Sequence, residues 1–174
     1  MGLVGSARCG AFSRLDPRGG HVAIARLGPF VHWQWRNGGL PQWAMDELGS
    51  KVRTNDPDYL DLTRLWYEQV LPHIVPRLAT RGGPVIILQL ENELGSAGSK
   101  GDDIARGSTD PEENAKHVLF YYGIVREHGV DVPIIDINHF PGKEQIEGLI
   151  DTGGCYVTSC FTSEGEFAPL STDW

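Results

Sequence analysis

The chain has 174 residues, 40% of them hydrophobic and 22% charged, a composition typical of a folded globular domain and not of a disordered chain. Its formal net charge of −8 argues against a protein that binds nucleic acid nonspecifically, because phosphate backbones attract an excess of Lys and Arg. The longest apolar stretches, 85–90 and 132–137, are much shorter than the roughly 20 residues that span a bilayer.

Residues 1–20 are rich in Gly, Arg and Ser and show no sustained hydrophobic period. We expect this segment to be poorly structured or to come from a misassembled reading frame, and we expect residues 21–174 to form the partial barrel domain. The stretch His21–Arg26 is predicted to be a strand. A long loop containing Gly28, Pro29 and Pro41 is predicted to follow it.

Asp56 and Pro57 predict the start of a helix, because Asp is a good N-cap and proline fits the first helical position. Pro72 and Pro76 should kink this helix or divide it. Its apolar face is predicted from residues at helical spacing: Leu62, Leu65, Trp66, Val70, Ile74 and Leu78.

Val85–Leu90 is predicted to be a strand buried on both faces of a parallel sheet, because it does not alternate until Gln89. Glu91, Asn92 and Glu93 follow at its carboxyl end, where the functional groups of parallel α/β folds lie. One amide and two carboxylates at this point indicate acid/base chemistry on a polar substrate.

The rest of the chain continues the alternation of helices and strands. After a polar loop at 95–109, the run Asp110–Glu113 predicts a helix start with a capping box, and Gly129 predicts its end. A strand at Val132–Asn138, a short helix near Glu144–Ile150 and a strand near Tyr156–Phe161 are predicted next. The apolar face of the helix that is predicted to start at Asp110 is formed by Ala115, Val118, Leu119, Tyr122 and Val125.

This order predicts an α/β fold with a parallel sheet, either a (β/α) barrel or an open doubly wound sheet. No glycine-rich phosphate loop occurs at a strand-to-helix turn, which disfavours a nucleotide-binding fold. A complete barrel has eight strands in about 250 residues, and about four strands are recognisable here. We therefore predict an incomplete (β/α)8 TIM barrel.

Two segments together carry a family resemblance: residues 28–43, GPFVHWQWRNGGLPQW, and residues 82–95, GGPVIILQLENELG. They resemble glycoside hydrolase family 35, the β-galactosidases, and the intervening Arg53–Asp56 is also similar to that family. The resemblance runs from about His21 to Ile150. It implies a retaining glycosidase barrel that hydrolyses terminal β-galactosides without a cofactor.

The resemblance places the family's acid/base Glu, which follows an Asn, at Glu93, and implies that Asn92 binds the 2-hydroxyl of the sugar. A retaining glycosidase also needs a nucleophilic carboxylate about 5 Å from the acid. Along an extended strand Glu91 would lie about 6–7 Å from Glu93. In the family this first Glu is not the nucleophile, and we expect it to form a salt bridge or hydrogen bond that orients its neighbours.

Further substrate contacts are predicted from the resemblance and from position. Gln34 stands where the family has a Glu that helps to bind galactose hydroxyls, Trp33 is either a sugar platform or a packing residue, and Asn138 contacts substrate or forms a turn. The family's nucleophile, at the end of its seventh strand, is not found, and Asp173 is not assigned that role. The expected enzyme is accordingly inactive as this fragment alone.

Two other hypotheses remain open at this stage. The chain could be a noncatalytic carbohydrate-binding remnant of a glycosidase barrel, or a structural remnant without a ligand. His32 and His139 are expected just past two strand ends, and Asp136 is near one of them. Without defined spacing they give weak support for a metal, and none is expected.

The partner expected from the resemblance is a carbohydrate with terminal β-galactose, and neither nucleic acid nor a membrane is expected. The first residues lack the basic and long apolar segments of a secretory signal. A cytoplasmic location is therefore favoured over export.

Overall fold

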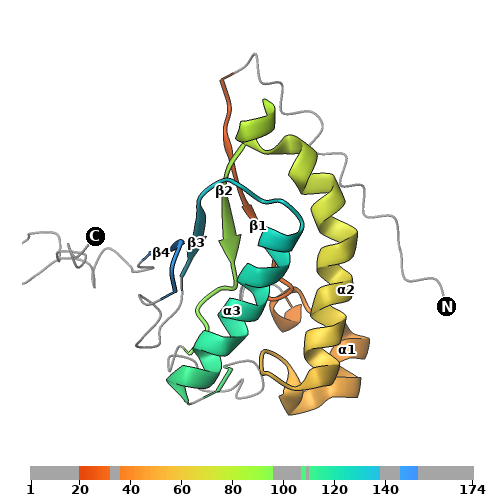
Figure 1. Ribbon diagram of the computed structural model, residues 1–174. Helices are drawn as coiled ribbons and strands as arrows, with labels where there is room; N and C mark the ends of the chain where they lie inside the picture. Colours follow the sequence, from red (N-terminus) through yellow and green to blue (C-terminus); the bar gives the residue numbers. More distant parts are fainter. Residues whose placement is uncertain (1–19, 32–35, 96–106, 109, 138–145, 153–174) are drawn as a thin grey trace, which may run out of the picture.

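The computed structural model describes residues 20–31, 36–95, 107–108, 110–137 and 146–152. Within these residues, four parallel strands form one sheet in the order β1-β2-β3-β4, with three α-helices (Figure 1). The strands are β1 (Ala23–Arg26), β2 (Val85–Leu90), β3 (Ile134–Asp136) and β4 (Leu149–Asp151), and the helices are α1 (Gln42–Leu48), α2 (Pro57–Ile74) and α3 (Pro111–Glu127). The predicted parallel α/β class is confirmed, while the described residues do not close a barrel.

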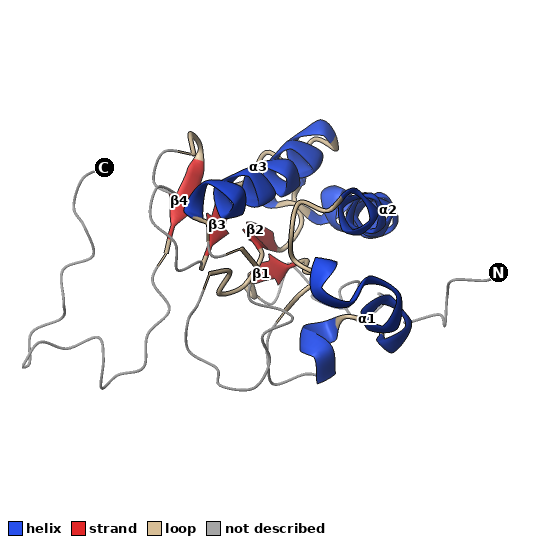
Figure 2. Cartoon of the chain, turned by 90° about the horizontal axis from the view of Figure 1, so that it is seen from below, coloured by secondary structure: helices blue, strands red, loops and turns tan. Residues whose placement is uncertain are grey.

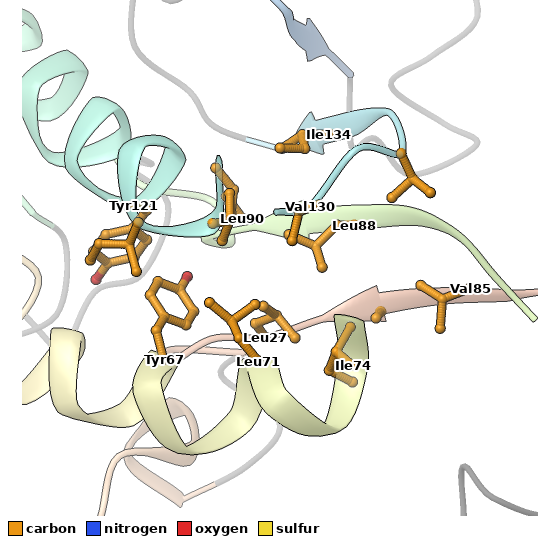
Figure 3. Packing of buried hydrophobic residues seen from close by; sticks show 14 of the residues in the cluster. Leu27, Tyr67, Leu71, Ile74, Val85, Leu88, Leu90, Tyr121, Val130 and Ile134 are labelled. Atoms are coloured by element: carbon orange, nitrogen blue, oxygen red, sulfur yellow. The ribbon is translucent and has the colours of Figure 1, made fainter. Parts of the chain in front are cut away.

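The core lies between the sheet and helices α2 and α3, which cover the same face (Figure 2). Ala25, Leu88, Ile134 and Leu149 are register partners across the four strands, so they point to one side of the sheet. Figure 3 shows how α2 and α3 contribute aromatic and aliphatic side chains to this layer. The buried cluster includes Leu27, Tyr67, Leu71, Ile74, Leu78, Val85, Leu88, Leu90, Tyr121, Ile124, Val125, Val130, Val132 and Ile134.

Strand β2 has the bounds predicted for it, Val85–Leu90, and it pairs with β1 on one side and β3 on the other. Ile86 and Ile87 are half-buried, so burial on both faces is complete only at the carboxyl half of the strand. The predicted strands at 21–26 and 132–138 are present as the shorter β1 and β3.

Helix α2 begins as predicted, since the Asp56 side chain accepts a hydrogen bond from the N–H of Asp58 at 3.1 Å. The helix includes Pro72 and ends at Ile74, two residues before Pro76, and a 3-10 turn follows at 75–77. The predicted apolar face is wrong in part, because two of its members are largely exposed, Leu65 at 52% and Trp66 at 45%. The buried face is Tyr59, Thr63, Tyr67, Leu71 and Ile74.

Helix α3 also begins at the predicted cap, where the Asp110 side chain accepts a hydrogen bond from the N–H of Glu112 at 2.9 Å. The predicted capping box is wrong. The carboxylate of Glu113 accepts a hydrogen bond from Asn55 instead, and the N–H of Asp110 donates to the hydroxyl of Ser108.

The end of α3 is as predicted, because Gly129 adopts a positive φ of 80° directly after it. Its predicted apolar face is again displaced, since Leu119 is 47% exposed. The residues that face the core are Asn114, His117, Val118, Tyr121, Ile124 and Val125.

No element was predicted for the stretch after Pro41, which contains α1 and a 3-10 turn at 49–51. One further prediction is wrong. The helix predicted near Glu144–Ile150 overlaps β4, whose pairing with β3 overrides the local helical pattern. The strand predicted at 156–161 lies outside the described residues, as does most of the loop predicted at 95–109.

Within the described part of the chain, no helix is long and apolar enough to cross a membrane.

Candidate active site

The carboxyl ends of β1, β2 and β3 meet at one edge of the sheet, because the strands are parallel (Figure 1). Glu91, Asn92 and Glu93 follow β2 at this edge, and the first family-like segment begins at Gly28, just after β1. Asp136 ends β3 as the register partner of Leu90. The structure thus brings both family-like segments to the edge at which parallel α/β folds bind their ligands.

The chain turns sharply as it leaves β2. Glu91 has a φ of 38° and Glu93 a φ of 54°, values in the left-handed region that residues other than glycine rarely adopt. The separation of 6–7 Å predicted for these two residues assumed an extended strand, and that assumption is wrong. Strained backbone of this kind persists where the surroundings impose it.

Two successive peptide groups of this turn are hydrogen-bonded at both ends. In the first, the carbonyl of Glu91 accepts from Nε2 of Gln89 at 3.0 Å, and the N–H of Asn92 donates to Oε2 of Glu91 at 2.7 Å. In the second, the carbonyl of Asn92 accepts from Nη2 of Arg53 at 2.7 Å, and the N–H of Glu93 donates to the carbonyl of Ile137. The backbone that leads to Glu93 is therefore fixed on both sides.

A fully buried ion pair between Arg53 and Glu91 lies behind this turn. Nη2 of Arg53 is 2.7 Å from Oε2 of Glu91, and Nε is 3.2 Å from Oε1. The guanidinium also stacks on the ring of Phe30, 3.8 Å from its centroid. The salt bridge predicted for Glu91 is confirmed, and it connects the first family-like segment, through Phe30, to the second.

His117 of α3 lies on the other side of the Glu91 carboxylate. Its Nε2 is 3.8 Å from Oε1 of Glu91, a distance for an ion pair and too long for a hydrogen bond. The ring stacks on Tyr59 and is tilted against Tyr121. His117 is therefore a packed and buried residue of α3.

Burial alone would raise the pKa of Glu91, because it disfavours the charged carboxylate. The positive charge of Arg53, the interactions with His117 and the hydrogen bonding of Arg53 together outweigh this effect, and the pKa of Glu91 lies below its ordinary value of 4.5. Glu91 is therefore an ionised carboxylate at neutral pH and is unsuited to donate a proton.

This lowered pKa predicts a loss of stability in acid. A carboxyl group whose pKa is depressed in the folded state stabilises the fold above its ordinary pKa, and that contribution disappears as the pH falls through the folded-state value. In Glu91→Gln the decline in the free energy of unfolding below about pH 4.5 should be smaller than in the unmodified protein. Urea unfolding at pH 7 and pH 4 measures the difference, with the exposed Glu47→Gln as control. Equal acid sensitivity in all three proteins would contradict the assignment.

The side chains of Asn92 and Glu93 differ in their surroundings. Asn92 is 2% exposed, and its amide nitrogen has no hydrogen-bond partner among the described residues. Glu93 is half-buried. Asp136 at the end of β3 is fully buried. A buried amide-bearing residue and a half-buried carboxyl-bearing residue thus follow each other at the end of β2.

The other predicted contacts, Gln34, Trp33 and Asn138, lie outside the described residues, as do His32 and His139. In the part of the chain that the structure describes, no group of three or more His, Cys, Asp or Glu side chains could hold a metal ion.

Sequence reasoning missed two parts of the site. Arg53 belonged to a family-like run, but nothing in its spacing indicated a pair with Glu91, 38 positions away. His117 gave no signal, because a histidine at helical spacing is equally compatible with a solvated face.

Comparison with known proteins agrees with this geometry. The family model of glycosyl hydrolases family 35 matches residues 3–144, a range that begins before His21, where the resemblance was expected to start. The chain is 42% identical over 85 residues to a β-galactosidase of Homo sapiens, a match that covers 49% of this chain and 13% of the relative. It is 38% identical over 90 residues to β-galactosidase 17 of Arabidopsis thaliana, covering 51% and 13% respectively.

These matches span a small part of each relative, whereas the family model spans most of the present chain. The family motif, the parallel sheet and the position of Asn92 and Glu93 at its carboxyl edge all agree with that match. The chain belongs to the glycosyl hydrolases of family 35.

Proposed function

We propose that this chain supplies the acid/base edge of a β-galactosidase that hydrolyses terminal β-galactosides with retention, and that Glu93 is the proton donor. One observation carries the proposal: in a family 35 chain, a half-buried Glu follows an Asn at the end of β2, on a turn in which two successive peptide groups are hydrogen-bonded at both ends. General acid catalysis depends on such fixed placement, because the proton must reach the leaving oxygen within hydrogen-bond distance.

In the proposed reaction Glu93 gives its proton to the glycosidic oxygen as the bond from that oxygen to C1 breaks. A second carboxylate attacks C1 from the opposite face and forms a covalent galactosyl-enzyme. The ionised Glu93 then removes a proton from water, which attacks C1 and releases galactose with its original configuration.

Glu91 is not proposed as the nucleophile. Both of its oxygens are engaged with Arg53, one of them also with the N–H of Asn92, and the side chain is fully buried. A sugar carbon has no route to a carboxylate held in this way. The nucleophile is not assigned to any residue that the structure describes.

Asn92 is proposed to donate its buried amide N–H to the 2-hydroxyl of the galactose. The absence of a partner among the described residues supports this role, because a buried amide donor is costly unless it gains a hydrogen bond. Gln34, Trp33 and Asn138 are proposed as further sugar contacts on the basis of the family resemblance.

The stereochemical course of hydrolysis tests the proposal. The intact protein, meaning this chain together with any native sequence that flanks it, is incubated with p-nitrophenyl β-galactoside. Proton NMR then identifies the anomer of galactose that appears first. We expect β-galactose, with the α anomer growing in by mutarotation. Initial release of the α anomer would contradict the retaining mechanism, and absence of turnover would contradict the enzymatic function.

A noncatalytic carbohydrate-binding protein is the second candidate, favoured by Gln34 in place of the family's galactose-binding Glu. Calorimetry with galactose distinguishes the two. Binding heat without turnover of any aryl galactoside supports the binding protein, whereas turnover excludes it.

A further inference from the structure

We infer that Glu91, together with Arg53, is a positioning residue that fixes the backbone from which Asn92 and Glu93 project. The inference rests on the proposed function only in so far as it assigns a catalytic consequence to this placement. Its structural content, that the carboxylate of Glu91 holds the Asn92 peptide group, can be tested separately.

Two donors meet at one carboxylate oxygen of Glu91. Oε2 of Glu91 accepts from Nη2 of Arg53 and from the backbone N–H of Asn92, each at 2.7 Å. The same Nη2 donates to the carbonyl of Asn92, also at 2.7 Å. One side chain thus binds the N–H of Asn92 while its partner binds the carbonyl of that residue.

The Arg53–Glu91 pair lies at a turn with unusual backbone conformation. Asn92 lies between two residues with positive φ, Glu91 at 38° and Glu93 at 54°. Such backbone relaxes toward the common regions unless its neighbours prevent it. The hydrogen bonds from Gln89 and to Ile137 restrain the outer ends of this turn, and the Arg53–Glu91 pair restrains its centre.

A second Arg–Glu ion pair in the protein only links two helices. Arg64 of α2 and Glu127 of α3 form a pair with Nη1 and Oε2 3.2 Å apart, but both side chains are exposed. That pair binds no backbone group in the turn after β2. It therefore provides a control of the same chemistry without the positioning contact.

Hydrogen exchange in the intact protein tests the structural content. In Glu91→Ala the N–H of Asn92 loses its acceptor, and we expect it to exchange about tenfold faster relative to the N–H of Leu88, which donates to Pro133. In Glu91→Gln, whose amide oxygen replaces one acceptor, the relative increase should be smaller. Glu127→Ala should leave the ratio unchanged.

If Glu91 only stabilised the fold as a whole, Glu91→Ala would increase the hydrogen-exchange rates of the Asn92 and Leu88 amides by the same factor, since loss of global stability opens β2 and the turn together. Such parallel acceleration in Glu91→Ala, or an unchanged ratio, would overturn the inference. If Glu91→Ala does not fold, the ratio in Glu91→Gln decides: an increase supports the inference, and a ratio equal to that of the unmodified protein overturns it.

Kinetics with p-nitrophenyl β-galactoside test the catalytic consequence at a temperature where each variant is folded. Misplacement of Glu93 should lower kcat by about tenfold or more in Glu91→Ala with a smaller change in KM, and Glu91→Gln should recover part of the loss. If the N–H of Asn92 exchanges faster in Glu91→Ala while kcat is unchanged, Glu91 holds the turn but has no effect on catalysis, and only the catalytic part of the inference is overturned. If Glu93→Gln is itself fully active, the proposed function fails, and the exchange ratio still decides whether Glu91 holds the turn.

Discussion

Glu93→Gln should lower kcat/KM for phenyl β-galactoside by about 10²- to 10⁴-fold, the usual contribution of a positioned general acid. Gln is nearly the same size as Glu, and it keeps hydrogen-bonding capacity but cannot donate a proton to the leaving oxygen. The loss should depend on the leaving group. A dinitrophenolate departs without protonation, so the variant should approach the unmodified protein when kcat/KM is measured with dinitrophenyl β-galactoside.

The series of aryl galactosides contains its own control, because every substrate places the same sugar in the site. The exposed Glu47→Gln serves as the matched variant and should behave as the unmodified protein with every leaving group. A uniform loss across all leaving groups would show that Glu93 acts on binding or folding and not as a proton donor. No loss for any substrate would remove Glu93 from the mechanism.

Arg53→Met should destabilise the fold by about 3–5 kcal/mol, because it leaves the carboxylate of Glu91 buried and without its charged partner. The Met side chain fills much of the space beside Phe30 but supplies no charge and no donor to the carbonyl of Asn92. Urea unfolding at neutral pH, followed by tryptophan fluorescence, measures the change in the free energy of unfolding.

Arg64→Met is the matched control, since Arg64 forms an exposed pair with Glu127, and it should cost no more than about 1 kcal/mol. The double variant Arg53→Met with Glu91→Gln should recover part of the loss, because it leaves no uncompensated buried charge. Equal costs for Arg53→Met and Arg64→Met would contradict the buried ion pair.

Local chemistry explains what could be predicted from the sequence. Strand β2 was predicted with its true bounds because it is an apolar run, broken only by Gln89, between Gly82-Gly83-Pro84 and the polar Glu91. The N-caps Asp56 and Asp110 were predicted because each precedes a proline, and their side chains bind the first turn as expected. The position of Asn92 and Glu93 at the strand end followed directly from these signals.

The helix faces could not be predicted in the same way. Apolar periodicity pointed to Leu65, Trp66 and Leu119, yet these side chains are largely exposed. Helices α2 and α3 instead turn Tyr59 and His117 inward, and both of these rings lie near the buried Arg53–Glu91 pair. A buried polar network selects aromatic and polar neighbours, so hydrophobicity alone assigns the wrong stripe.

The ion pair itself was foreseen only in outline. A salt bridge or hydrogen bond was the expectation for Glu91. Its partner, Arg53, precedes α2 in the sequence whereas Glu91 follows it, and the fold brings the two together. The left-handed backbone at Glu91 and Glu93 was missed, because the sequence has no glycine at either position to signal it.

A crystal structure of the intact protein with a thio-linked β-galactoside, which is bound without being cleaved, tests the central claim most directly. We expect a carboxyl oxygen of Glu93 to contact the sulfur that replaces the glycosidic oxygen, and the amide of Asn92 to bind the 2-hydroxyl, with hydrogen-bond distances near 2.6–3.2 Å for oxygen partners. A galactoside bound at this edge with Glu93 directed away from the glycosidic atom, and another acid in its place, would contradict the account.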